Sequence, residues 1–96
     1  MDYDELVDTL KSAGNASRCN DVKAWLSGAG FNIKRGKGNH YVVTHPGLPG
    51  FTTGSFDCGH GSNPEVKKPY IKKILNHIVK RYEKELRKYL QEGQDD

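Results

Sequence analysis

The stretch FNIKRGKGNHYVVT, residues 31–44, decides the fold of this chain. Its first five residues alternate apolar and polar side chains, and its last five are rich in β-forming types, so each part predicts a strand. The Gly-Lys-Gly-Asn sequence at residues 36–39 tolerates the positive φ angles that a tight connection needs. We therefore predict a β-hairpin here.

Two further elements follow the predicted hairpin. Residues 46–50, Pro-Gly-Leu-Pro-Gly, suit neither a helix nor an inner strand, and residues 51–57 predict a third strand. Over residues 69–90, apolar side chains recur at helical spacing, and the proline at the start suits the first turn of a helix. Because charge density rises after Tyr82, we expect the end of this helix to project beyond the core. We expect residues 91–96 to be frayed.

Two helices are predicted before the hairpin. Residues 2–13 carry apolar side chains at three- and four-residue steps, with acidic side chains in the first turn. A second helix begins near Cys19 or Asn20, carries Trp25 as a core anchor, and ends at the glycines of residues 28–30.

The order α-α-β-β-β-α predicts an α+β fold, with a three-stranded antiparallel sheet and helices on one face. A chain of 96 residues forms one small domain. We place its core at about residues 19–82.

Composition narrows the class of protein. Hydrophobic residues make up 34% of the chain and the mean hydropathy is −0.80. No segment approaches the roughly 20 apolar residues of a membrane span. Residues 1–5 are acidic, unlike a signal peptide. We expect a cytosolic protein with no membrane association.

The two cysteines, Cys19 and Cys58, are too few for a disulfide scaffold, and we expect two reduced thiols. Together with His45 and His60 they number the four ligands of a zinc site, but the usual spacing of zinc ligands along the sequence is missing. We therefore predict no metal and no cofactor.

Positive charge is concentrated in the middle of the chain. The whole sequence carries a net charge of +3, whereas residues 31–81 carry nine basic and two acidic side chains, a net +7. An excess of this size favours a polyanionic partner, with nucleic acid the first candidate. The alternative is a solvated basic helix face.

Three groups of residues, taken in order, resemble the HicA family of toxins. Residues 30–41 are similar to the family's helix end, basic strand and glycine-serine-histidine element, and His45-Pro46 follows them. Residues 57–61, Asp-Cys-Gly-His-Gly, are similar to its strand end with a histidine-glycine pair. Residues 68–75 are similar to the opening of its last helix. The resemblance spans residues 19–80.

The resemblance implies a fold like that of double-stranded-RNA-binding domains, metal-independent cleavage of mRNA, and neutralisation by a HicB antitoxin. Asn39 stands where the family has serine, and it is another small polar residue that suits the turn. The helix at residues 2–13, the extension beyond Tyr82 and the long connection at residues 46–50 are additions to the family pattern.

His40 is the candidate catalytic residue. Cleavage of RNA without a metal needs a base for the ribose 2′-hydroxyl, an acid for the departing 5′-oxygen and charge near the phosphorus. Imidazole suits proton transfer near neutral pH. His60 is the candidate for the second proton-transfer group, because it follows the third predicted strand. His45 precedes a proline and is expected to be a turn residue, and Tyr41 points to the face opposite His40.

The predicted RNA contacts lie in two places. Around the hairpin turn they are Lys34, Arg35, Lys37, Gly38 and Asn39, and on the last helix they are Lys68, Lys72 and Lys73. Basic side chains can hold phosphates, while glycines let the RNA backbone approach closely.

Two other functions remain open from the residues alone. One is a non-catalytic RNA-binding module that uses the same basic surface with His40 as a contact. The other is a protein-interaction adaptor in which the added helical segments bind the partner.

Overall fold

The computed structural model describes residues 2–13, 17–59 and 61–94. The helices that precede the sheet are α1 (Tyr3–Ala13) and α2 (Cys19–Gly28). The strands are β1 (Asn32–Arg35), β2 (His40–Thr44) and β3 (Gly54–Asp57). The last helical region comprises α3 (Lys68–Lys73), the π-helical η2 (Ile74–Val79), the 3-10 turn η3 (Lys80–Tyr82) and α4 (Glu83–Gln94).

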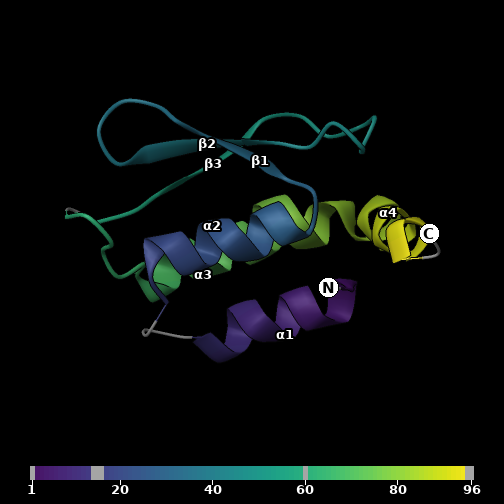
Figure 1. Ribbon diagram of the computed structural model, residues 1–96, viewed down its shortest axis with the longest axis horizontal. Coiled ribbons are helices and arrows are strands. Elements are labelled where there is room, and N and C mark those ends of the chain that lie inside the picture. The colour runs from purple at the N-terminus through teal and green to yellow at the C-terminus, as the bar shows by residue number, and fades with distance from the viewer. Residues whose placement is uncertain (1, 14–16, 60, 95–96) are drawn as a thin grey trace.

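The strands form an antiparallel sheet in the order β1-β2-β3. Figure 1 shows three layers: the sheet, then α2 with α3, then α1 on the side away from the sheet. The predicted α+β class, the order of elements and the antiparallel sheet with helices on one face are confirmed. The third strand is shorter than predicted, because it begins at Gly54 rather than at residue 51.

The core lies between the sheet and the middle helices. Its largest fully buried side chains include Phe56 from β3, Leu26 from α2 and Ile78 from η2. Trp25 is half-buried and packs against this core, as expected of an anchor. Burial of such side chains contributes about 1.5–3 kcal/mol each, which makes this interface the main source of stability.

Helix α1 begins where the sequence predicts and covers the middle layer with an apolar stripe. The Oδ1 atom of Asp2 accepts a 2.8 Å hydrogen bond from the backbone N–H of Glu5, which caps the helix. Leu6 and Leu10 have no exposed surface. The helix is therefore part of the folded unit, packed on the face of the helical layer away from the sheet.

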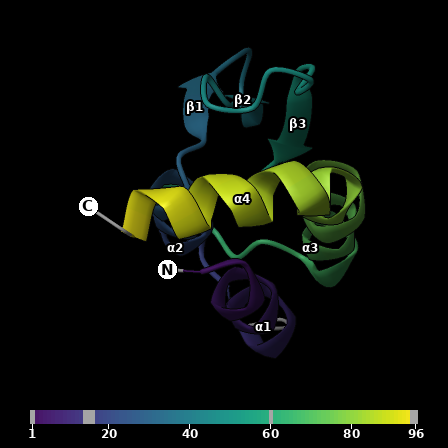
Figure 2. The same ribbon diagram turned by 90° about the vertical axis from the view of Figure 1, so that its right-hand side faces the viewer.

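The prediction that the last helix projects beyond the core is wrong. Figure 2 shows α4 crossing the end of the molecule, at an angle to α3. Leu86 is 0% exposed and Leu90 is 7% exposed, so the four-residue spacing of two leucines buries a face despite the surrounding charge. The prediction that residues 91–96 are frayed is wrong for residues 91–94, because α4 continues to Gln94. Residues 95 and 96 lie outside the described part.

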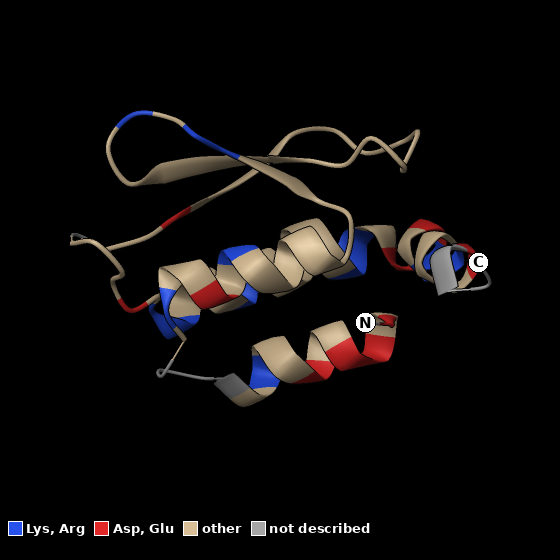
Figure 3. Ribbon diagram, in the orientation of Figure 1, with Lys and Arg blue, Asp and Glu red and all other residues tan. Residues whose placement is uncertain are grey.

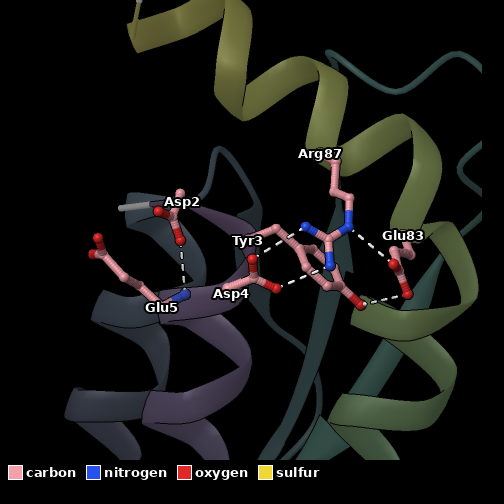
Figure 4. A network of polar contacts seen from close by, with 6 residues as sticks. All are labelled: Asp2, Tyr3, Asp4, Glu5, Glu83 and Arg87. Carbon is pink, nitrogen blue, oxygen red and sulfur yellow. Dashed lines mark hydrogen bonds and ion pairs between the residues drawn. The ribbon is translucent and has the colours of Figure 1, made fainter.

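Arg87 ties α4 to α1 (Figure 4). Its Nη2 lies 2.9 Å from Oδ1 of Asp4, and its Nε lies 2.9 Å from Oε2 of Glu83. The guanidinium also lies 4.3 Å from the ring centroid of Tyr3, whose hydroxyl donates to Glu83 at 3.4 Å. These contacts join two segments that the sequence alone had suggested were separate additions.

His45 has a structural role, as expected of a turn residue. Its Nε2–H donates to the carbonyl of Ala29 at 2.9 Å, and its Nδ1 accepts from the N–H of Gly47 at 3.1 Å. The Phe31 and Tyr89 rings meet the imidazole edge to face, at centroid distances of 4.7 and 4.6 Å. The buried imidazole thus anchors the loop after β2 to α2 and α4.

The prediction of two reduced thiols is wrong in this structure: Cys19 and Cys58 form a disulfide, with their Cα atoms 5.9 Å apart. The chain brings them together because the N–H of Cys19 bonds the carbonyl of Pro64, while the N–H of Cys58 bonds that of Asn39. Sequence spacing could not show this approach, since the two residues are 39 positions apart.

Within the described part of the chain, no helix is long and apolar enough to cross a membrane.

Candidate functional site

His40 and Asp57 face each other across two neighbouring strands. The register pairs them directly, and Nδ1 of His40 lies 2.8 Å from Oδ1 of Asp57. The adjacent pair, Asn39 and Cys58, carries a ladder hydrogen bond, so His40 and Asp57 form the closer, non-hydrogen-bonded type of pair. Their side chains are 44% and 45% exposed, which leaves the imidazole accessible to a large substrate.

Alternation along the strands assigns each side chain to one face of the sheet. Tyr41 stacks on Phe56 toward the helices, so its neighbour His40 points to the open face, as predicted. Lys34 and Ser55 both pair in register with Val42, and they therefore share the open face with His40. This open face carries an imidazole, a carboxylate, a hydroxyl and an ammonium group within two neighbouring rows.

The β1–β2 turn presents His40 at the start of its strand. The N–H of Gly36 donates to the carbonyl of His40 at 2.7 Å, and the N–H of His40 donates to the carbonyl of Lys37 at 3.1 Å. Gly38 has a φ of 60°, which a side chain would strain. A Cβ atom at Gly36 would lie 3.4 Å from the His40 ring, so glycine keeps this side of the imidazole clear.

The structure separates the predicted contacts of the hairpin. Lys34 shares the open face with His40, and Lys37 is exposed in the turn. Arg35 instead pairs with Tyr41, which places it on the helix side of the sheet, where its Nε–H donates to the carbonyl of Gly38 at 3.0 Å. Asn39, one residue from His40, also lines a cavity on that side.

The predicted contacts on the last helix lie far from His40. Lys68 and Lys72 line a cavity of about 370 Å³ between α1 and α3, together with Lys11 and Lys80. Lys73 is exposed on the same helix. The cavity lies on the side of the helical layer away from the sheet. Figure 3 shows the basic residues of α1 and α3 apart from those of the β1–β2 turn. RNA contacts by these lysines stay a prediction.

The sequence predicts His60 as the second proton-transfer group. His60 lies outside the described residues, so its predicted role stays a prediction. Sequence reasoning missed Asp57 as the partner of His40. The sequence predicts both strands but not their register, and it is the register that sets residue 40 opposite residue 57. Within the described part, no three His, Cys, Asp or Glu side chains gather as a metal-binding group.

The fold and the open face of the sheet define a small α+β protein that displays a histidine–carboxylate pair at one end of its sheet. Comparison with family models matches residues 19–79 to the family described as HicA toxin of bacterial toxin-antitoxin. Because this match covers more than half of the chain, the protein belongs to the HicA toxin family. No curated protein and no solved structure matches the chain. Helix α1, the turn η3 and the whole of α4 lie outside the matched residues.

Proposed function

We propose that this toxin is an endoribonuclease that cleaves mRNA, with His40 as the general base and Asp57 as its positioning partner. The observation that carries the proposal is the 2.8 Å contact between Nδ1 of His40 and Oδ1 of Asp57 on the open face. As a HicA toxin it has an antitoxin partner. We infer that this partner is HicB-like.

Asp57 determines which imidazole nitrogen acts as the base. A carboxylate only accepts hydrogen bonds, so it holds the proton on Nδ1 of His40 and leaves the lone pair on Nε2. Among the described residues, no hydrogen bond to Nε2 competes for that lone pair. The same contact fixes the ring orientation and stabilises the imidazolium that forms after proton transfer.

The reaction proceeds by attack of the ribose on its own phosphate. Nε2 of His40 takes the proton of the 2′-hydroxyl, O2′ forms a bond to phosphorus, and the bond from phosphorus to O5′ breaks. The products are a 2′,3′-cyclic phosphate and a free 5′-hydroxyl. The departing oxygen needs a proton from a second donor, and His60 stays our prediction for it. Lys34, in the neighbouring row, supplies positive charge for the phosphorane.

The test is cleavage of an RNA transcript by the purified protein and by its His40→Ala variant. We expect a loss of about 10²–10⁴-fold in cleavage rate, the usual contribution of a general base. Cleaved RNA from the wild type should carry 2′,3′-cyclic phosphate ends. His77, an exposed histidine on η2, is the matched control, and His77→Ala should cleave like the wild type.

Retained cleavage in His40→Ala would overturn the catalytic assignment. Loss of cleavage with unchanged RNA binding supports it. If the wild type binds RNA but never cuts it, the chain is a binding module rather than an enzyme.

A further inference from the structure

A small polar cavity lies at the end of the sheet where β1 ends, β2 begins and β3 ends. Its volume is about 120 Å³, and it lies between the start of α2, strand β2 and the segment after β3. Two basic side chains line it, Lys23 from α2 and Arg35 from β1. Lys23 does not figure among the contacts that the sequence predicts.

Lys23 and Arg35 line the cavity without a counter-charge. No carboxylate lines the cavity, and within the described part of the chain neither Lys23 nor Arg35 forms an ion pair. Arg35 is oriented by the hydrogen bond from its Nε–H to the carbonyl of Gly38, which is 3.0 Å long. Two like charges that share a partly enclosed site repel each other, and an anion between them relieves that repulsion.

The wall of the cavity is held in place by the core. Tyr41 stacks on the fully buried Phe56, and the Lys23 ammonium lies 4.9 Å from the centroid of the Tyr41 ring. The Cys19–Cys58 disulfide forms another part of the wall and joins α2 to the end of β3. A site that is ordered before its ligand arrives loses little entropy on binding.

The ligand chemistry follows from size and from the state of the tyrosine ring. Phe56 stacks on the Tyr41 ring and Lys23 lies over it, so the ring is not a free platform for a nucleobase. The two cations, with Asn20 beside them, instead suit a compact, multiply accepting anion. A phosphate group meets this description.

The cavity is adjacent to His40 but on the other side of the sheet. Asn39 and Tyr41, the chain neighbours of His40, line it, while His40 points to the open face. Gly36 and Gly59 lie near the end of the sheet and carry no side chain there. An RNA strand that leaves His40 can therefore pass over this end of the sheet and reach Lys23 and Arg35.

We propose that Lys23 and Arg35 hold a phosphodiester of the RNA substrate, a few nucleotides along the strand from the bond cleaved at His40. This inference rests on the proposed endoribonuclease function. The phosphate subsite accounts for Arg35 on the face opposite to the catalytic pair. It assigns to α2 a part in binding the substrate.

The test measures RNA affinity against salt concentration. The probe is a single-stranded RNA oligonucleotide, and every protein carries His40→Ala so that the RNA stays intact. Lys23→Gln with Arg35→Gln should reduce the slope of log affinity against log salt by about 0.7–1.4, the value for one to two lost phosphate contacts on a single strand. The charge-matched control is Lys84→Gln with Lys88→Gln on exposed positions of α4, which should leave the slope unchanged.

Two further measurements separate the sources of the anion and the role of folding. The swap Lys23→Arg with Arg35→Lys keeps both charges, and it should restore most of the slope if the folded cavity binds phosphate. Inorganic phosphate should bind much more weakly than RNA, with its chemical-shift changes confined to residues around the cavity.

An unchanged slope in the Lys23, Arg35 double variant overturns the subsite. Tight binding of inorganic phosphate that RNA does not displace also overturns it, because the site then serves a free anion. In a protein that keeps His40, the substitutions Lys23→Gln and Arg35→Gln should raise the KM for RNA cleavage with little change in kcat. If His40→Ala still cleaves while the slope changes as expected, the proposed catalysis fails and the phosphate subsite stands.

Discussion

Nδ1 of His40 lies 2.8 Å from Oδ1 of Asp57, across the β2–β3 ladder and on the face of the sheet opposite to the helices. Both side chains come from regular strands, so the geometry of the pair is set by backbone pairing rather than by a mobile loop. This relationship gives Asp57 a role that can be tested separately from that of His40.

Replacing the carboxylate by an amide should switch the imidazole to the wrong tautomer. In Asp57→Asn the side-chain amide can donate to Nδ1, which moves the ring proton to Nε2 and removes the basic lone pair there. We expect kcat for RNA cleavage to fall by about 10²–10⁴-fold. Ser55→Ala, on the same strand and face, should stay within a few-fold of the wild type. An Asp57→Asn enzyme as active as the wild type would contradict the dyad.

Substitution of Gly47 should destabilise the protein because Tyr89 packs against it. A Cβ atom at Gly47 would lie 2.7 Å from Cδ2 of the tyrosine ring. We expect Gly47→Ala to lower the free energy of unfolding by about 1–3 kcal/mol in urea titrations. Tyr89→Ala in the same chain should relieve much of this cost, as a coupled pair requires. Gly50→Ala is the control, since nothing lies within 4 Å of its added Cβ.

Substitution of Leu86 tests whether α4 packs on the core or projects beyond it. Its side chain is fully buried, so Leu86→Ala should lower the free energy of unfolding by about 3 kcal/mol. Lys84→Ala, two residues earlier and exposed, should leave stability nearly unchanged. Equal midpoints for the two variants in chemical denaturation would show that α4 does not pack in solution.

The ion pair between Asp4 and Arg87 should give stability a specific pH dependence. The hydrogen bond from Arg87 lowers the pKa of the Asp4 carboxyl below its usual value of 3.8. A lowered folded-state pKa stabilises the protein above the unfolded value, and this contribution disappears as pH falls through the folded value. Asp4→Asn should therefore lower the melting midpoint at pH 7 but leave it unchanged near pH 2.

Asp8 provides the control for the Asp4 experiment. It is exposed on the same helix, and within the described part of the chain it has no ion pair. Asp8→Asn should change the midpoint little at either pH. A loss in Asp4→Asn that persists at pH 2 would mean that the effect does not come from the ion pair.

The disulfide predicts a dependence of stability on reductant. Closing a loop of 39 residues restricts the unfolded chain, and loop-closure entropy puts the stabilisation at about 4 kcal/mol. Cys19→Ser with Cys58→Ser should lower the urea midpoint, and added dithiothreitol should then have no further effect. Identical midpoints for the oxidised wild type and the double variant would contradict the stabilising role of the disulfide.

The sequence by itself determined the elements and their faces. Alternation in residues 31–35 and 40–44 predicts the two strands of the hairpin, and the three- and four-residue spacing predicts the helices. It also placed His40 and Tyr41 on opposite faces, because side chains on a strand alternate. These properties depend on residues close together in the chain, which is why local patterns suffice for them.

Tertiary structure alone decided which distant residues meet. Strand register placed Asp57 beside His40, and chain folding brought Cys58 to Cys19. Helix α4 packs on the core because Leu86 and Leu90 are buried against its apolar surface and Arg87 forms an ion pair with Asp4. The residues of a charge-rich helix do not show whether the rest of the chain forms an apolar surface against which the helix can pack. Its burial therefore could not be predicted from the local sequence.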